Sequence, residues 1–162
     1  MPYLMRQKIF SFGDDFVIKD EAGNDRFFID GKVFSIGDKL SFQDMQGREL
    51  AFIRQKLFSW GKTYEINYNA GTAVVKKELF TFFQCAFTID VPGPGDLEAT
   101  GDLLDHEYTF TRGGRTVASV SKKWFTMADT YGIDIAPGED DVLILASAVV
   151  IDLCCHADRK HS

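Results

Sequence analysis

The chain has 162 residues, of which 45% are hydrophobic and 14% aromatic, and its formal net charge at pH 7 is −6. This length suits a single domain over residues 1–162, and the apolar content excludes an intrinsically disordered chain. The negative net charge argues against nucleic acid as a partner, because binding phosphates needs an attractive positive field.

The cysteines and the apolar segments bear on cellular location. The chain has three cysteines, an odd number, and Cys154 and Cys155 are adjacent. We therefore expect no disulfide framework, which favours a reducing compartment. The apolar stretch from Val142 to Cys155 is shorter than the ~20 residues that cross a bilayer. The start of the sequence has no apolar run of signal-peptide length. We expect a cytoplasmic protein without a transmembrane segment.

The first half of the chain contains a 24-residue repeat. The motif Phe-Ser-x-Gly occurs three times, and a second glycine series runs in phase with it. Both series indicate turns, because glycine readily adopts the positive φ that many turns need. Between the glycines, apolar and polar residues alternate, which is typical of β-strands. The motif glycines, expected at positive φ or in tight turns, are Gly13, Gly37 and Gly61; the second series is Gly23, Gly47 and Gly71.

The second half continues this pattern after an interruption. Residues 91–105 form an insertion, and alternation resumes before a turn at 112–114 and a strand expected over 116–122. The motif then restarts at Lys123 and Phe125. Phe125 follows Gly114 at the same spacing that separates the motif phenylalanines from the turn glycines in the earlier copies. A turn roughly every 12 residues predicts a meander of antiparallel hairpins with ten to twelve strands.

The C-terminal segment differs in character. Acidic residues at 139–141 precede the stretch Val142 to Ile151, in which Ser147 is the one polar residue. Acidic side chains favour a helix N-terminus, and a helix that is apolar on every side is buried on every side. A closed barrel can surround such a helix, and closure also removes the exposed edges of a long meander. A β-propeller is the competing architecture, but the chain is too short for four blades and a helix.

The sequence therefore predicts a mainly β fold, a closed antiparallel β-barrel of about twelve strands around a buried, hydrophobic C-terminal helix. Residues 122–125, 129–135 and 138–152 resemble the LURP-one-related family, which is similar to the tubby C-terminal domain and, more distantly, to phospholipid scramblases. The resemblance covers nearly the whole chain and implies a twelve-stranded barrel threaded by a helix. The resemblance also implies two functions: plant members of the family are linked to defence, and tubby proteins bind phosphoinositides.

Basic side chains are the candidates for an anion or lipid-headgroup site. Tubby-like domains use lysine and arginine on the barrel surface in this role. The alternative is that these residues are solvated strand positions that discourage edge pairing. The six candidates are Lys76, Lys77, Arg112, Arg115, Lys122 and Lys123.

Asp152 stands out as a carboxylate within an apolar helix. A buried carboxylate needs a partner, so we expect a bond to an arginine, a lysine or a backbone donor. The functional interpretation is a polar anchor in a ligand-lined barrel. The structural interpretation, which we favour, is a lock on the helix register.

No motif indicates a catalytic residue, a metal site or a cofactor. The S-x-x-K pattern at 119–122 falls in an expected strand, where residues three apart point to opposite faces. The cysteines lack the C-x-x-C spacing of a closed zinc site. The acid–base sequence at 105–107 has no nucleophile motif beside it, and we interpret it as a transition from loop to strand.

The sequence supports three hypotheses for function. The first is a non-enzymatic binding or scaffold module that recognises phosphoinositides or other anionic headgroups. The second is a protein–protein interaction module in a stress or defence response. The third is an enzyme whose pocket the sequence does not reveal. A clustered basic patch would favour the first, an exposed aromatic patch the second, and a deep cleft with a perturbed titratable group the third.

Overall fold

The computed structural model describes residues 2–6, 16–31, 39–56, 63–78, 86–124 and 130–160. Within these ranges it has twelve strands and one helix. The elements are β1 (Pro2–Arg6), β2 (Phe16–Asp20), β3 (Asp25–Asp30), β4 (Lys39–Asp44), β5 (Glu49–Gln55), β6 (Thr63–Tyr68), β7 (Gly71–Glu78), β8 (Ala86–Asp90), β9 (Leu97–Asp102), β10 (Glu107–Arg112), β11 (Arg115–Ser121), β12 (Thr130–Ile135) and α1 (Asp141–Lys160).

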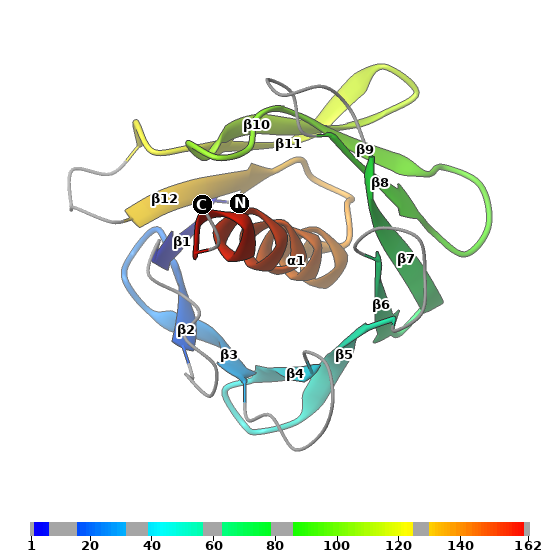
Figure 1. Ribbon diagram of the computed structural model, residues 1–162. Coiled ribbons are helices and arrows are strands. Elements are labelled where there is room, and N and C mark those ends of the chain that lie inside the picture. Colours follow the sequence, from blue (N-terminus) through cyan, green and yellow to red (C-terminus); the bar gives the residue numbers. More distant parts are fainter. Residues whose placement is uncertain are drawn as a thin grey trace.

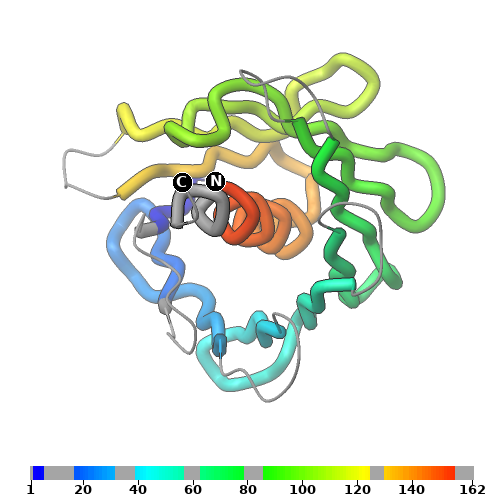
Figure 2. The backbone as a smooth tube through the Cα atoms, viewed as in Figure 1, coloured from blue at the N-terminus to red at the C-terminus, as the bar shows by residue number. Residues whose placement is uncertain are grey.

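The strands form a closed antiparallel barrel (Figure 1). Each strand pairs with the next one along the chain, and the first and last strands pair with each other from Pro2↔Asp134 to Arg6↔Thr130. Figure 2 shows the backbone passing once around this ring before the helix runs through it. Closure pairs the backbone groups of both end strands, so the meander has no open edge. The predicted fold class and strand number are confirmed.

The helix α1 lies inside the barrel, as its uniform apolarity predicts (Figure 1). Its side chains from residue 143 to residue 152 are all buried. They form one core with the inward-facing strand residues, of which Phe42, Phe87 and Phe110 are among the largest fully buried side chains. The barrel therefore has a filled interior, and the helix supplies the filling.

The connections alternate between two ends of the barrel because the strands alternate in direction. We call the end where α1 begins the cap end; it carries the turns at 21–24, 45–48, 69–70, 91–96 and 113–114. We call the other the tail end; its described turns are 103–106 and 122–124.

The cap-end turns confirm the second glycine series. Gly23 and Gly47 have φ of 86° and 84°, and Gly71 has φ of 130°. The turn at 112–114 is also confirmed, with positive φ at Gly113 and Gly114, as a tight hairpin turn needs. The motif glycines Gly13, Gly37 and Gly61 lie outside the described residues, so their expected conformation stays a prediction.

Candidate functional site

The two described turns of the tail end are held together by charged and polar side chains. Lys122 Nζ donates to Asp105 Oδ1 at 2.6 Å, which joins the turn after β11 to the turn before β10. Lys122 N and Ser121 Oγ both donate to Glu107 Oε1 at 3.0 Å. The position of Lys122 is therefore set by contacts with Asp105 and Glu107.

These turns expose apolar side chains. Trp124 is 45% exposed and Leu104 is 42% exposed, and they are two of the three large hydrophobic residues exposed in the described part of the chain. Lys123 lies beside Trp124 and is itself exposed. We call Leu104, Lys122, Lys123 and Trp124 the Trp124 surface. Exposed tryptophan beside lysine is the combination that favours contact with a partner that is both apolar and charged.

A fully buried polar cluster lies at the same end, inside the barrel. His106 and Asp152 are each 1% exposed. His106 Nε2 donates to Asp152 Oδ1 at 2.9 Å, and the Tyr131 hydroxyl donates to Asp152 Oδ2. The His106 and Tyr131 rings are stacked, with centroids 4.1 Å apart. The cluster connects the 103–106 turn, β12 and α1.

The environment of this cluster keeps its phenols protonated. Burial, followed by the charge of Asp152, raises the pKa of Tyr131 well above its ordinary value. The same two causes raise the pKa of Tyr108, which is also fully buried. A protonated Tyr131 hydroxyl can donate to the Asp152 carboxylate, and this hydrogen bond joins β12 to α1.

The backbone at His106 directs its side chain into the barrel. His106 has φ of 54°, and it is the one non-glycine residue with positive φ among those described. This left-handed conformation is uncommon, although histidine adopts it more readily than most residues. The turn therefore places an ionisable ring in the core directly before β10 begins at Glu107.

Asp152 has different partners from those expected. The sequence predicted an arginine, a lysine or a backbone donor, whereas the structure supplies His106 and Tyr131. The transition from loop to strand at 105–107 is present, but its buried histidine was not anticipated. No signal in the sequence points to the pairing, because the partners lie 46 and 21 residues away from Asp152.

The predicted basic residues lie in separate parts of the barrel. Arg112 is half-buried at the cap end, where its Nε donates to the Gly95 carbonyl at 2.7 Å. Its Nη1 donates to both oxygens of the Glu139 carboxylate at 2.8 and 2.7 Å. Arg112 thus joins the loop before β9 to the segment that leads into α1. Arg115 is paired with Arg112 in the strand ladder and is exposed at the same end.

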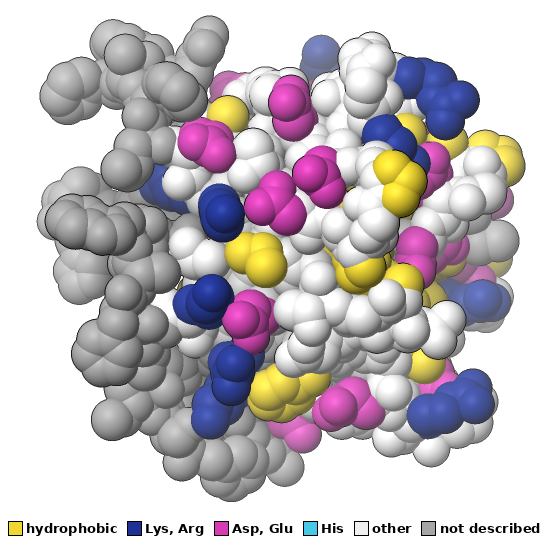
Figure 3. Space-filling model, turned by 90° about the vertical axis from the view of Figure 1, so that its right-hand side faces the viewer, with side chains coloured by type: hydrophobic (Ala, Val, Ile, Leu, Met, Phe, Trp, Pro, Cys, Tyr) yellow, Lys and Arg dark blue, Asp and Glu magenta, His cyan; other side chains and the backbone are white. Residues whose placement is uncertain are grey.

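Lys76 and Lys77 are neighbours on β7, so their side chains point to opposite faces. Lys76 is exposed and lies 3.4 Å from Asp90 in an ion pair, while Lys77 shares the face of the buried Ala73 and Val75. Three strands separate β7 from β11 in the barrel. Figure 3, which shows the wall around β7, has acidic and basic side chains interspersed. The structure does not gather the six candidates. They lie as three separate pairs, on β7, beside the 113–114 turn at the cap end, and at the start of the 122–124 turn at the tail end.

The described residues contain no group of three His, Cys, Asp or Glu side chains arranged to hold a metal ion. Across the same ranges, no helix combines the length and apolarity needed to cross a membrane. Cys154 and Cys155 are buried in the core cluster.

A family model described as LURP-one-related matches residues 1–152. The chain belongs to the LURP-one-related family. The uncharacterised protein YxjI of Bacillus subtilis (strain 168) is 37% identical over 158 residues, which covers 98% of this chain and 96% of that protein. A protein of Arabidopsis thaliana solved by X-ray crystallography has a TM-score of 0.63 and 20% identity, covering 93% of this chain and 88% of its own. This second likeness concerns the fold alone.

The family resemblance seen in the sequence is thereby confirmed. Membership of this family and the closed barrel support a general role as a binding module. Neither of these two relatives carries an enzymatic name.

Proposed function

We propose that the protein binds anionic lipid headgroups through the Trp124 surface. The observation that carries this proposal is the exposed Trp124 at the tail end, directly after Lys122 and Lys123 in the chain. Leu104 is exposed in the turn that the Lys122–Asp105 bond joins to this segment. Tryptophan favours the membrane–water interface because its ring is apolar and its indole nitrogen donates a hydrogen bond. Lysine beside it adds attraction to anionic headgroups, about 1 kcal/mol for each residue near the surface.

The charges around the Trp124 surface determine how strongly it should bind an anionic membrane. The net charge of −6 repels an anionic bilayer at long range, and Asp105 neutralises part of the Lys122 charge. Lys123 forms no ion pair with any described residue and supplies the clearest local attraction. Binding should therefore be modest, sensitive to salt, and dependent on the apolar pair as well as on the lysines.

The exposed apolar pair also favours a second function, a protein–protein contact at the same surface. Aromatic side chains often dominate protein interfaces. Such a contact would need Trp124 and Leu104 but would not depend on lipid charge. A role in stress or defence stays a prediction of the family resemblance.

Flotation with lipid vesicles tests the proposal. The unmodified protein should bind vesicles of phosphatidylcholine that contain phosphatidylserine or a phosphoinositide, and bind pure phosphatidylcholine more weakly. Lys123→Glu should reduce binding to the anionic vesicles roughly tenfold, because it replaces an attraction with a repulsion. Trp124→Ala should reduce binding to both kinds of vesicle.

Two matched charge reversals serve as controls. Arg115→Glu changes an exposed cation at the cap end, and Lys76→Glu changes one on the barrel wall. Both should leave vesicle binding close to that of the unmodified protein. The proposal fails if the unmodified protein does not float with anionic vesicles, or if Arg115→Glu weakens flotation as much as Lys123→Glu. Loss with Trp124→Ala but no dependence on lipid charge would favour the protein contact.

A further inference from the structure

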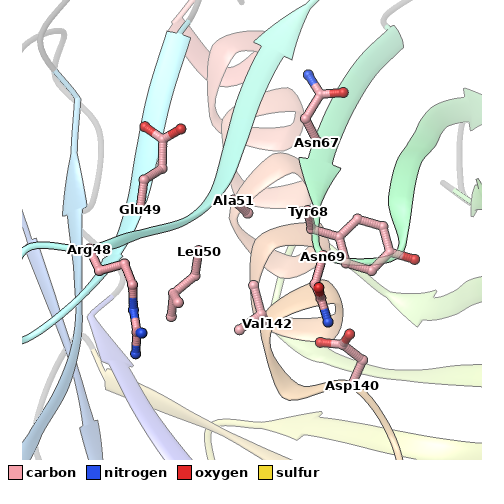
Figure 4. Close-up of a pocket in the computed structure, with 9 residues that line it drawn as sticks. All are labelled: Arg48, Glu49, Leu50, Ala51, Asn67, Tyr68, Asn69, Asp140 and Val142. Atoms are coloured by element: carbon pink, nitrogen blue, oxygen red, sulfur yellow. The ribbon is translucent and has the colours of Figure 1, made fainter.

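The cap end contains a pocket of about 730 Å³ that opens between β5, the end of β6 and the start of α1 (Figure 4). This volume falls within the range of small-molecule sites, roughly 300–1,000 Å³. The side chains that matter for its chemistry are Arg48, Leu50, Ala51, Asn69, Asp140 and Val142. The pocket lies at the opposite end of the barrel from the Trp124 surface.

The middle of the pocket is apolar. Leu50 and Val142 are only partly buried, although both pack against the core, and Ala51 is buried behind them. In Figure 4 Leu50 from β5 and Val142 from α1 point toward the same space. Partly exposed aliphatic groups from two elements form a floor on which an apolar group can be buried.

One side of this floor carries an arginine, Arg48. The backbone N of Arg48 donates to Asp44 Oδ1 at 2.9 Å, and its Nε donates to Asp44 Oδ2 at 3.1 Å. The hydrogen bond from the Arg48 backbone is the main cause that lowers the Asp44 pKa, so Asp44 stays ionised and holds the guanidinium. The Arg48 side chain is 79% exposed and its Nε is paired with Asp44 at 3.1 Å, which leaves its two terminal nitrogens to present the fork that a carboxylate matches.

The opposite side carries a carboxylate and an amide. Asp140 caps the helix, since its Oδ1 accepts a hydrogen bond from Leu143 N and its carbonyl accepts one from Ile144 N, both at 3.1 Å. The other carboxylate oxygen takes no part in this cap. Figure 4 places Asp140 and the Asn69 amide on the far side of Leu50 and Val142 from Arg48. Opposite charges therefore flank the apolar floor.

This arrangement selects a ligand with two charges. A simple anion would meet the carboxylates of Asp140 and Glu49, and a simple cation would meet Arg48. We propose that the pocket binds a short peptide with free ends. Its terminal carboxylate would pair with Arg48, its terminal ammonium would pair with Asp140, and an aliphatic side chain would lie on Leu50 and Val142. A peptide suits the site better than one amino acid, because the two charged groups approach from opposite sides of the floor.

Calorimetric titration of the full chain tests this proposal with defined probes. The probes are leucine and glycine-flanked leucine peptides of two to four residues, each in free, N-acetylated and C-amidated form. At least one free peptide should bind, and blocking either end should weaken binding about tenfold, which corresponds to the loss of one charged contact. Free leucine should bind less tightly than the best peptide.

Two variants test which residue binds each terminus of the peptide. Arg48→Gln should weaken binding of the free peptide but have little further effect on the C-amidated one. Asp140→Asn should weaken binding of the free peptide but not of the N-acetylated one, and asparagine still caps the helix. Arg115→Gln, at the same end but outside the pocket, is the matched control and should bind like the unmodified chain.

Thermal unfolding of each variant shows that it is folded before titration. The proposal is overturned if no free peptide of the series binds, or if doubly blocked peptides bind as well as free ones. It is also overturned if Arg48→Gln and Arg115→Gln have equal effects. None of these outcomes bears on vesicle binding, because every change lies at the cap end.

Discussion

The turns at 21–24 and 45–48, at the cap end, differ from the 103–106 turn, at the tail end, in the contacts that hold them. At the cap end, Asp20 and Asp44 accept hydrogen bonds from backbone groups two and four residues later, within their own turns. The 103–106 turn has a local bond of this kind, from Asp105 N to Asp102 Oδ1, and is held in addition by Asp152 of the helix and by Lys122. The turns at 21–24 and 45–48 are ordered by bonds among their own residues, whereas the 103–106 turn also depends on contacts that form only in the completed barrel.

This difference bears on where each candidate site sits. The cap-end pocket takes its arginine from a turn that is ordered by local bonds to Asp44, and the Arg48 side chain is itself 79% exposed. The Trp124 surface rests on the buried His106–Asp152 pair and on the Lys122–Asp105 bond. Damage to the core should therefore reach the tail-end surface before it reaches the cap-end turns.

Changes in the helix α1 should lower the stability of the fold most, because both ends of the barrel depend on this helix. Ile151→Ala should lower the free energy of unfolding by about 2–5 kcal/mol, since the side chain is fully buried and leaves a cavity. Removing residues 142–162 should abolish cooperative folding, because the barrel would lose its filling. Urea unfolding followed by circular dichroism measures both.

Leu153→Ala is the matched control for the helix. Because Leu153 is only partly buried, this substitution should lower the free energy of unfolding by less than Ile151→Ala does. A truncated chain that remains soluble and unfolds cooperatively would contradict this view. The helix would then be peripheral, and a binding surface would have to be sought on it.

Asp152→Ala should cause the next largest loss of stability, and this loss should loosen the tail end first. The substitution removes the acceptor of the His106 Nε2 and of the Tyr131 hydroxyl in a fully buried site, and leaving a buried group unsatisfied costs about 1–3 kcal/mol. Hydrogen exchange should rise first in the 103–106 turn and leave the turns at 21–24 and 45–48 protected.

Ser147→Ala is the control on the same helix. The Ser147 hydroxyl is buried and has no hydrogen-bond partner among the described residues. Its removal should be neutral or slightly stabilising. Equal losses for Asp152→Ala and Ser147→Ala would show that the polar cluster contributes nothing beyond packing.

The smallest change in stability is expected for a substitution in a cap-end turn, and it should depend on pH. Backbone hydrogen bonds, first of all from Arg48, lower the pKa of Asp44 below its ordinary value of 3.8. A carboxylate whose pKa is lower in the folded state stabilises the fold above its unfolded pKa, and loses that contribution as the pH falls through the folded pKa. Asp44→Asn should therefore be less stable than the unmodified chain at neutral pH.

That difference should shrink as the pH is lowered through 3.8 and toward the folded pKa of Asp44. Urea unfolding of both proteins over this range provides the test. Asp20→Asn should behave alike, because Asp20 makes the equivalent bonds one repeat earlier. A difference that stays constant with pH would mean that the charge of Asp44 has no part in the turn.

Local features of the fold could be predicted because they depend on short-range rules. Alternating apolar residues identified the strands, and the glycines of the second series identified the cap-end turns. The apolar run before Asp152 predicted a helix buried on all sides, and only a closed barrel can bury it so. Each of these conclusions uses residues that are close together in the chain.

The contacts between distant elements were decided by the tertiary structure. Periodicity shows which face of a strand is buried, but the stagger of the closed barrel determines which buried side chains meet. That stagger brings His106 and Tyr131 to Asp152, and an unusual φ at His106 completes the cluster. It also separates Lys76 and Arg112 from Lys122, and it places Arg48 across an apolar floor from Asp140. The amino-acid sequence by itself determined the barrel and its filling, while strand order and stagger decided which polar groups share a site.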